Sequence, residues 1–163
     1  MSGALSGQGL QVGDRAPDFT LRDQYGQEVT LSEVVPDTHA LIVFYPFAFS
    51  GICDGELLEI QLNIDRFSND AVQVFGISCD AGPAVKAWAA HEGYRFPLLS
   101  DFWPHGEVAS AYGVLHQESG MAMRGTFLVD PTMTIRWALV YGPGEQRDIG
   151  VLHDAVKGLP RPA

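Results

Sequence analysis

Residues 41–53 read LIVFYPFAFSGIC, an apolar run followed by a short loop and a cysteine. The run 41–45 is short, continuous and rich in β-branched and aromatic residues, which predicts a fully buried strand. A helix is predicted from about 52 to 67, because apolar residues recur there at steps of four, three, four and three. These residues are Cys53, Leu57, Ile60, Ile64 and Phe67. The pattern therefore places Cys53 in the first turn of a helix that follows a buried strand.

A cysteine at this place is expected to be reactive. Free backbone N–H groups and the positive end of the helix dipole both favour a thiolate in a first helical turn. The pKa of Cys53 is therefore expected below the value of roughly 8.5 for a free thiol, so that the sulfur is a nucleophile at neutral pH. The alternative is an inert core residue, since free cysteines are among the most buried residue types. The strand–loop–helix context favours the reactive thiol.

The loop before Cys53 carries groups that suit attack of a thiolate on a peroxide. The hydroxyl of Ser50 can accept and donate a hydrogen bond, and the backbone N–H of Cys53 is a second donor. Pro46 has no N–H and fixes the chain at the end of the strand. Phe47 and Phe49 can line a dry wall around the sulfur. The cation that keeps the sulfur ionised must come from elsewhere in the chain.

The motif P-x-x-x-S-x-x-C at residues 46–53 resembles the active-site signature of the peroxiredoxins, which are thiol peroxidases on a thioredoxin-like fold. The likeness covers nearly the whole chain, because four more stretches follow the order that is usual in the family. They are APDF at 16–19, FPLLSD at 96–101, AYGV at 111–114 and RGTF at 124–127. The strings FSGIC at 49–53 and SDFWPHG at 100–106 are similar to the one-cysteine alkyl hydroperoxide reductase E group.

This resemblance implies a role for each matching residue. Cys53 would be the peroxidatic cysteine, and Arg124 the guanidinium that stabilises its thiolate and the transition state. Pro46 and Ser50 would form the pocket. Glu56 occupies a place in the first helical turn that is usually acidic in the family.

Arg124 also has an ordinary interpretation, because most arginines make surface salt bridges that contribute little. Its place in the sequence favours a role in the site. It precedes Gly125 and the strand-like run 126–129, and strand ends are where α/β folds present their site residues.

The function predicted is a thiol-dependent peroxidase. The Cys53 thiolate attacks one oxygen of a hydroperoxide, alcohol or water leaves, and a sulfenic acid remains. The resemblance implies an external reductant, either mycothiol with a mycoredoxin-like protein or a thioredoxin. Hydrogen peroxide and alkyl or fatty-acid hydroperoxides are the expected substrates, with peroxynitrite as a further candidate. An aromatic wall would suit the larger ones: Phe47, Phe49, Phe102 and Trp103.

Two other functions use the same cysteine. A disulfide oxidoreductase needs C-x-x-C, whereas this chain has Glu56 at the position of the second cysteine. A non-catalytic redox sensor would be oxidised at Cys53 and would then change its association with a partner. Cys79 follows the apolar run 74–78 and is interpreted as a small core residue, with a resolving cysteine as the alternative. The five histidines show no close ligand spacing, so neither a metal nor another cofactor is expected.

Composition and charge set the class of protein. The chain has 163 residues, of which 46% are hydrophobic, and carries a formal net charge of −10. We expect a flexible tail at residues 1–11 and a single domain at 12–163. The acidic surface argues against binding of nucleic acid or anionic membranes, both of which call for basic patches. Neither a signal-peptide pattern nor a membrane-spanning run is found, so a cytoplasmic protein is expected. A homodimer is expected by analogy with the family.

The remaining pattern predicts an α/β fold with a thioredoxin-like central mixed sheet flanked by helices. Strands at 41–45 and 72–78 form a βαβ unit with the helix between them. A further helix runs from Pro83 to His91 and ends at Gly93. Two runs, 126–129 and 134–140, flank a turn and predict an antiparallel hairpin, and the last helix is expected at about 149–157.

Overall fold

The computed structural model describes residues 10–142 and 144–160, with the side chains of residues 52–54 outside that description. The main sheet is built from β1 (Thr20–Arg22), β2 (Glu28–Thr30), β3 (His39–Phe44), β4 (Val72–Ser78), β5 (Leu98–Ser100), β8 (Arg124–Val129) and β9 (Ile135–Tyr141). The helices are α1 (Leu31–Val34), α2 (Gly51–Leu62), α3 (Ile64–Phe67), α4 (Gly82–Glu92), α5 (Glu107–Ala111) and α6 (Ile149–Val156). A small separate pair is formed by β6 (Leu115–His116) and β7 (Met121–Ala122).

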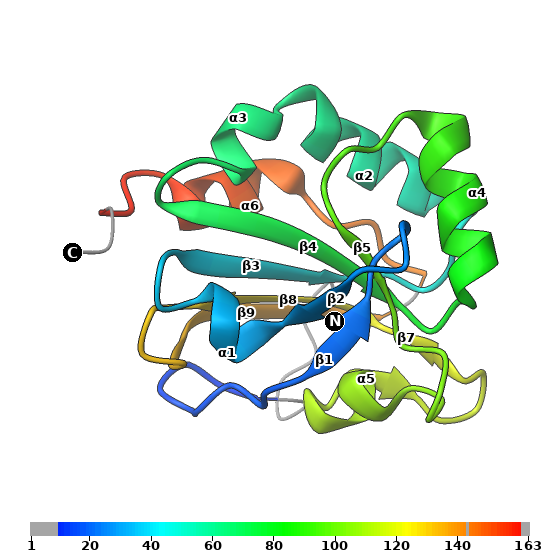
Figure 1. Cartoon of the computed structure of the whole chain (residues 1–163), viewed down its shortest axis with the longest axis horizontal. Coiled ribbons are helices and arrows are strands. Elements are labelled where there is room, and N and C mark those ends of the chain that lie inside the picture. The colour runs from blue at the N-terminus through cyan, green and yellow to red at the C-terminus, as the bar shows by residue number, and fades with distance from the viewer. Residues whose placement is uncertain (1–9, 143, 161–163) are drawn as a thin grey trace.

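The seven strands are ordered β2-β1-β5-β4-β3-β8-β9, so that the predicted buried strand lies inside the sheet (Figure 1). β3 pairs parallel with β4 and antiparallel with β8. Every residue of β3 is buried, as the continuous apolar run predicts. Its side chains alternate between the two faces, because Ile42 belongs to one core cluster and Leu41 and Val43 to the other. β3 is therefore the strand on which both cores are built.

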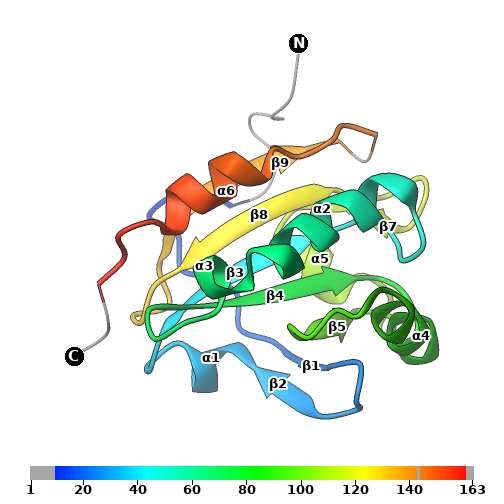
Figure 2. The same cartoon turned by 90° about the horizontal axis from the view of Figure 1, so that it is seen from above.

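Helices cover both faces of the sheet (Figure 2). α2, α3, α4 and α6 contribute buried residues to the cluster that contains Leu41. α1 and α5 contribute to the cluster that contains Ile42. This mixed sheet between helices is the thioredoxin-like arrangement predicted from the sequence. No helix in the described ranges is both long and apolar enough to cross a membrane.

Most predicted elements are confirmed. β3, β4 and α4 lie where the pattern placed them, and Gly93 ends α4 with a left-handed φ of 77°. β8 and β9 form the predicted antiparallel hairpin. The helix predicted from about 52 to 67 is wrong in one respect, because it breaks at Asn63 into α2 and α3. The Asn63 side chain donates to the Glu59 carbonyl at 2.8 Å, and this local hydrogen bond competes with the regular helix.

The predicted tail falls largely outside the described residues, which begin at residue 10. Leu10 is partly buried against the core, and Gln11 donates its backbone N–H to the Asp14 carboxylate at 2.9 Å. The chain is thus attached to the sheet from residue 10 onward. For residues 1–9, flexibility stays a prediction.

Candidate active site

The parts of the candidate site meet at one edge of the sheet. β3 and β4 are parallel and both end there, at Phe44 and Ser78. β8 runs antiparallel to β3, with Thr126 opposite Val43, so that its first residue, Arg124, begins at the same edge. The topology therefore brings the loop after β3 and the start of β8 together, although about 70 residues separate Cys53 and Arg124 in the chain.

The loop after β3 leads directly into α2. Pro46 is buried, and Ser50 is the N-cap residue in extended conformation, although its hydroxyl does not cap the helix. Phe49 has a left-handed φ of 64°, which residues other than Gly, Asn and Asp rarely adopt. Cys53 is the third residue of α2, in the predicted first turn. Its side chain lies outside the described part of the structure.

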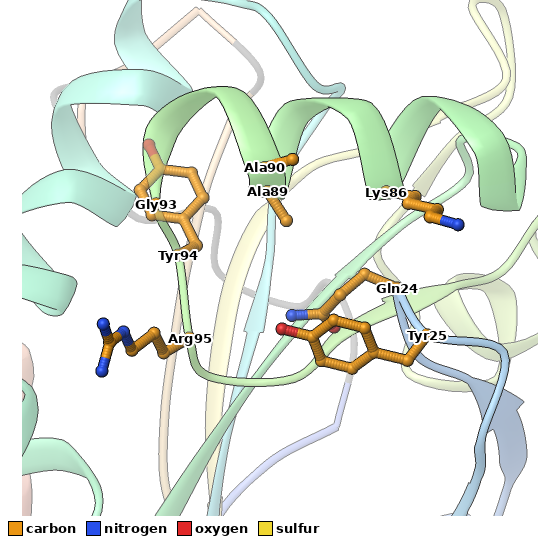
Figure 3. Close-up of a pocket in the computed structure, with 8 residues that line it drawn as sticks. All are labelled: Gln24, Tyr25, Lys86, Ala89, Ala90, Gly93, Tyr94 and Arg95. Atoms are coloured by element: carbon orange, nitrogen blue, oxygen red, sulfur yellow. The ribbon is translucent and has the colours of Figure 1, made fainter.

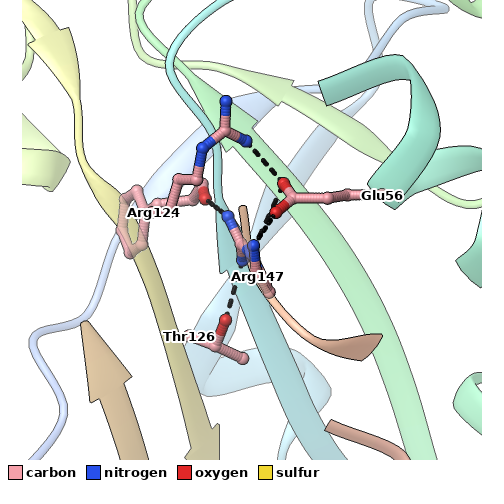
Figure 4. A network of polar contacts seen from close by, with 5 residues as sticks. Glu56, Arg124, Thr126 and Arg147 are labelled. Atoms are coloured by element: carbon pink, nitrogen blue, oxygen red, sulfur yellow. Dashed lines mark hydrogen bonds and ion pairs between the residues drawn. The ribbon is translucent and has the colours of Figure 1, made fainter. Parts of the chain in front are cut away.

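A buried carboxylate one helical turn after Cys53 joins α2 to two arginines (Figure 4). Glu56 accepts a hydrogen bond from Arg124 Nη1 at 2.5 Å and one from the backbone N–H of Arg147 at 2.5 Å. Arg147 also donates to Thr126 Oγ1 at 2.7 Å and to the Phe44 carbonyl at the end of β3. The network thereby fixes the first turns of α2 against β3 and β8.

These charged groups lie in the interior of the protein. Glu56 and Arg124 are each 1% exposed and Arg147 is 2% exposed. Burial of a charge is costly unless it is paired and hydrogen-bonded. Two guanidinium groups and one carboxylate carry one net positive charge between them, next to the positive end of the α2 dipole. The site is electrostatically suited to an anion, such as a thiolate, at the start of α2.

The aromatic residues predicted to form one wall lie in different places, with Phe102 and Trp103 together at a hollow that Phe47 and Phe49 do not line. Phe47 is 45% exposed and lies beside Pro46. Phe49 is 54% exposed and faces α4, with its ring 6.4 Å from the Trp88 ring. Trp103 is 82% exposed and lies between β1 and α5. Within one chain, Trp103 therefore does not line the same hollow as Pro46 and Phe47.

Cys79 follows β4 and is 6% exposed. Burial raises the pKa of its thiol to about 12, with further contributions from the Asp101 and Asp80 carboxylates. A thiol with so high a pKa is almost entirely protonated at neutral pH and is a poor nucleophile. These properties match the interpretation of Cys79 as a core residue.

Two hollows lie close to these elements. One, of about 330 Å³, borders Pro46 and Phe47 and reaches the end of β4 at Cys79. The other, of about 270 Å³, lies between α4 and the turn after β1, with Lys86 and Arg95 at its two ends (Figure 3). The predicted site residues do not line the second hollow. Within the described ranges, no group of three or more His, Cys, Asp or Glu side chains is placed to hold a metal ion.

A thioredoxin-like sheet, with a cysteine in the first turn of the helix after the buried strand β3 and a buried arginine at the same edge, defines the class of the peroxiredoxins. The model of the AhpC/TSA family matches residues 12–138, so the chain belongs to this family of thiol-dependent peroxidases. It is an oxidoreductase that acts on a hydroperoxide and uses a thiol reductant.

Individual relatives agree with this assignment. The chain is 49% identical over 150 residues to alkyl hydroperoxide reductase E of Mycobacterium tuberculosis H37Rv, which covers 92% of this chain and 98% of the relative. It is 29% identical over 156 residues to peroxiredoxin 2 of Picrophilus torridus, covering 92% of this chain and 76% of the relative. Among solved structures, Enterococcus faecalis AhpC superposes with a TM-score of 0.80 at 27% identity, covering 90% of each chain. Mycobacterium tuberculosis AhpC superposes with a TM-score of 0.77 at 26% identity, covering 90% of this chain and 96% of the other.

Proposed function

We propose that Cys53 is the peroxidatic cysteine of a one-cysteine peroxidase. Its thiolate attacks one oxygen of the hydroperoxide, the O–O bond breaks, and the alkoxide or hydroxide leaves and takes up a proton. The sulfur is oxidised to a sulfenic acid while the peroxide is reduced to an alcohol or water. The observation that supports this most is the excess positive charge of the Arg124–Glu56–Arg147 network, buried one turn from Cys53.

The other site residues have defined tasks in this proposal. Arg124 stabilises the thiolate and the charge that develops on the peroxide oxygens, because its planar donors can address both. Ser50 supplies a hydroxyl that is not engaged as a helix cap. Pro46 is buried at the base of the loop, and Phe47 and Phe49 provide exposed apolar surface beside it.

The substrates and the reductant follow from the same features. We propose hydrogen peroxide, alkyl and fatty-acid hydroperoxides, and peroxynitrite as substrates. The exposed rings of Phe47 and Phe49 can accept the alkyl chain of the larger hydroperoxides. The low reactivity expected of Cys79 supports resolution by an external thiol, either mycothiol with a mycoredoxin-like protein or a thioredoxin-like protein. The cytoplasmic location and the homodimer both stay predictions. Sedimentation analysis of the reduced protein measures the oligomeric state directly.

Turnover separates this function from that of a redox sensor. The reduced protein is mixed with cumene hydroperoxide in large excess, together with an external thiol, and peroxide is assayed over time. A peroxidase consumes many equivalents per chain, and mass spectrometry of a thiol-free sample shows a Cys53 sulfenic acid. Consumption of a single equivalent, with the thiol present, would instead identify a sensor.

A further inference from the structure

Asp80 lies just beyond the end of β4 and connects this strand to the loop that precedes α2. Its Oδ2 atom accepts a hydrogen bond from the backbone N–H of Ala48 at 2.7 Å and another from Ser78 Oγ at 2.7 Å. Its own carbonyl accepts from Ser100 Oγ at 2.6 Å. Both the side chain and the backbone of Asp80 are thus fixed by neighbouring strands, so the carboxylate is a rigid anchor for Ala48.

The loop that Asp80 contacts holds an unfavourable backbone conformation. Phe49, the residue after Ala48, has a φ of 64°, and such conformations persist only where the surroundings hold them. On its far side, the Phe49 ring contacts Trp88 and His91 of α4 at centroid distances of 6.4 and 6.2 Å. The hydrogen bond from the Ala48 backbone N–H to Asp80 restrains the loop on the side of β4.

Packing supports only part of this loop. Pro46 is buried and Ala48 belongs to the core cluster that contains Leu41, whereas Phe47 is 45% exposed and borders the hollow of about 330 Å³. Asp80 lines the same hollow. A hydrogen bond to a carboxylate is stronger than one between neutral groups, so this contact adds to the packing of Ala48 in fixing the loop beside the hollow.

We propose that Asp80 is a positioning residue of the peroxidase site, acting through Ala48 and Phe49 on the placement of Ser50 and the start of α2. The inference rests on the proposed function, because its effect is exerted on the residues assigned there to peroxide binding. In this proposal Asp80 acts through the backbone of Ala48 and sets the geometry of the donors assigned to the peroxide.

Asp80→Ala and Asp80→Asn test this role. The second-order rate constant for oxidation of Cys53 by hydrogen peroxide is measured by stopped flow, and the pKa of Cys53 is measured by thiolate absorbance. Asp80→Ala should lower the rate constant by about tenfold to a hundredfold, the usual range for loss of a hydrogen bond to a charged group. The rate constants are compared at a pH where Cys53 is ionised in every variant, so that a change in its pKa does not enter the comparison. Asp80→Asn keeps an oxygen that can accept from Ala48 and should recover part of the rate even if the alanine variant folds poorly.

Asp130→Ala is the matched control, because Asp130 also holds a loop by accepting backbone N–H groups, from Thr132 at 2.8 Å and Thr134 at 3.1 Å. It follows β8 at the opposite end from Arg124 and should lose stability without a change in oxidation rate. The positioning role is overturned if Asp80→Asn and Asp80→Ala are oxidised as fast as wild type, or if Asp130→Ala loses rate equally. Failure of the wild type itself to react at Cys53 would instead overturn the proposed function.

Discussion

Glu56→Gln is the substitution whose effect on stability can be estimated most directly from the structure. It keeps the size and shape of the side chain but removes the negative charge that lies between two buried guanidinium groups. Arg124 donates to this carboxylate at 2.5 Å, and Arg147 Nε lies 3.6 Å from it. All three side chains are at most 1% exposed, so water cannot replace the lost charge.

The expected loss is large for a single isosteric change. Removal of one partner of a buried ion pair costs about 3–5 kcal/mol, because an uncompensated charge is left in the interior. The glutamine oxygen can still accept one hydrogen bond, which favours the lower end, about 3 kcal/mol. For a domain of this size each kcal/mol lowers the Tm by roughly 2–4 °C, so the Tm should fall by about 10 °C.

Urea denaturation of reduced protein at pH 7, followed by circular dichroism, measures this loss. Glu59→Gln is the matched control, since Glu59 is an exposed carboxylate on the same helix and its variant should stay within about 0.5 kcal/mol of wild type. If Glu56→Gln unfolds within about 1 kcal/mol of wild type, the network does not hold a costly buried charge. The electrostatic argument for the site would then be incorrect.

The remaining predictions concern the rate, the second thiol and the pH dependence. Arg124→Ala should slow oxidation of Cys53 about a hundredfold, or on the order of 3 kcal/mol, and should raise the pKa of Cys53. Arg124→Lys should restore more of the Cys53 pKa than of the oxidation rate. Equal stopped-flow rates for wild type and Arg124→Ala, at a pH where Cys53 is ionised in both proteins, would contradict this. Cys79→Ser should keep most of the thiol-driven turnover, and a dominant disulfide between Cys79 and Cys53 in the mass spectrum after one equivalent of peroxide would argue against the one-cysteine mechanism. Burial would raise the pKa of Asp130, but hydrogen bonds from Thr132, Arg136 and Thr134 lower it from 3.8 to about 2. The contribution of the Asp130 carboxylate to the stability of the fold, on the order of 2 kcal/mol, is therefore complete above about pH 4 and lost as the pH falls through about 2. The urea midpoint of Asp130→Asn should depend less on pH in this window than that of wild type. An unchanged dependence would refute the assignment.

The elements that position the site could be predicted because their signals are local. The run 41–45 has the composition of a buried strand, and its neighbours along the chain specify the loop and the helix that follow. The break at Asn63 was not predicted, because apolar periodicity does not register a side chain that hydrogen-bonds to the helix backbone. The helix pattern continues across this residue, although the helix itself does not.

The residues of the site are predictable from the sequence where they share a local motif or, as for Arg124, where the family resemblance and a strand end single them out. Pro46, Ser50 and Cys53 fall within eight positions and share one motif. The contact between Glu56 and Arg147 spans 91 positions and has no local signal, since only the antiparallel return of the chain brings the two together. The contact between Asp80 and Ala48 spans 32 positions and has no local sequence signal either.

The positions of the aromatic residues show a further limit of sequence reasoning. Phe49 was expected to line a pocket because it is apolar and close to the cysteine, but its direction depends on a left-handed φ that no residue type in the loop requires. The apolar character of Phe49 and Trp103 does not indicate whether the two lie together. The structure places Trp103 beside β1 and α5, at 82% exposure.

The most direct test of the central claim is stopped-flow oxidation of wild type and Cys53→Ser by hydrogen peroxide and cumene hydroperoxide, with peroxide consumption measured in the presence of an external thiol. The proposed mechanism predicts rapid oxidation and turnover by wild type. It predicts neither sulfenic acid nor peroxide consumption by a folded Cys53→Ser variant, while Cys79→Ser remains active. Substantial peroxidase activity in Cys53→Ser would contradict the assignment of the peroxidatic cysteine.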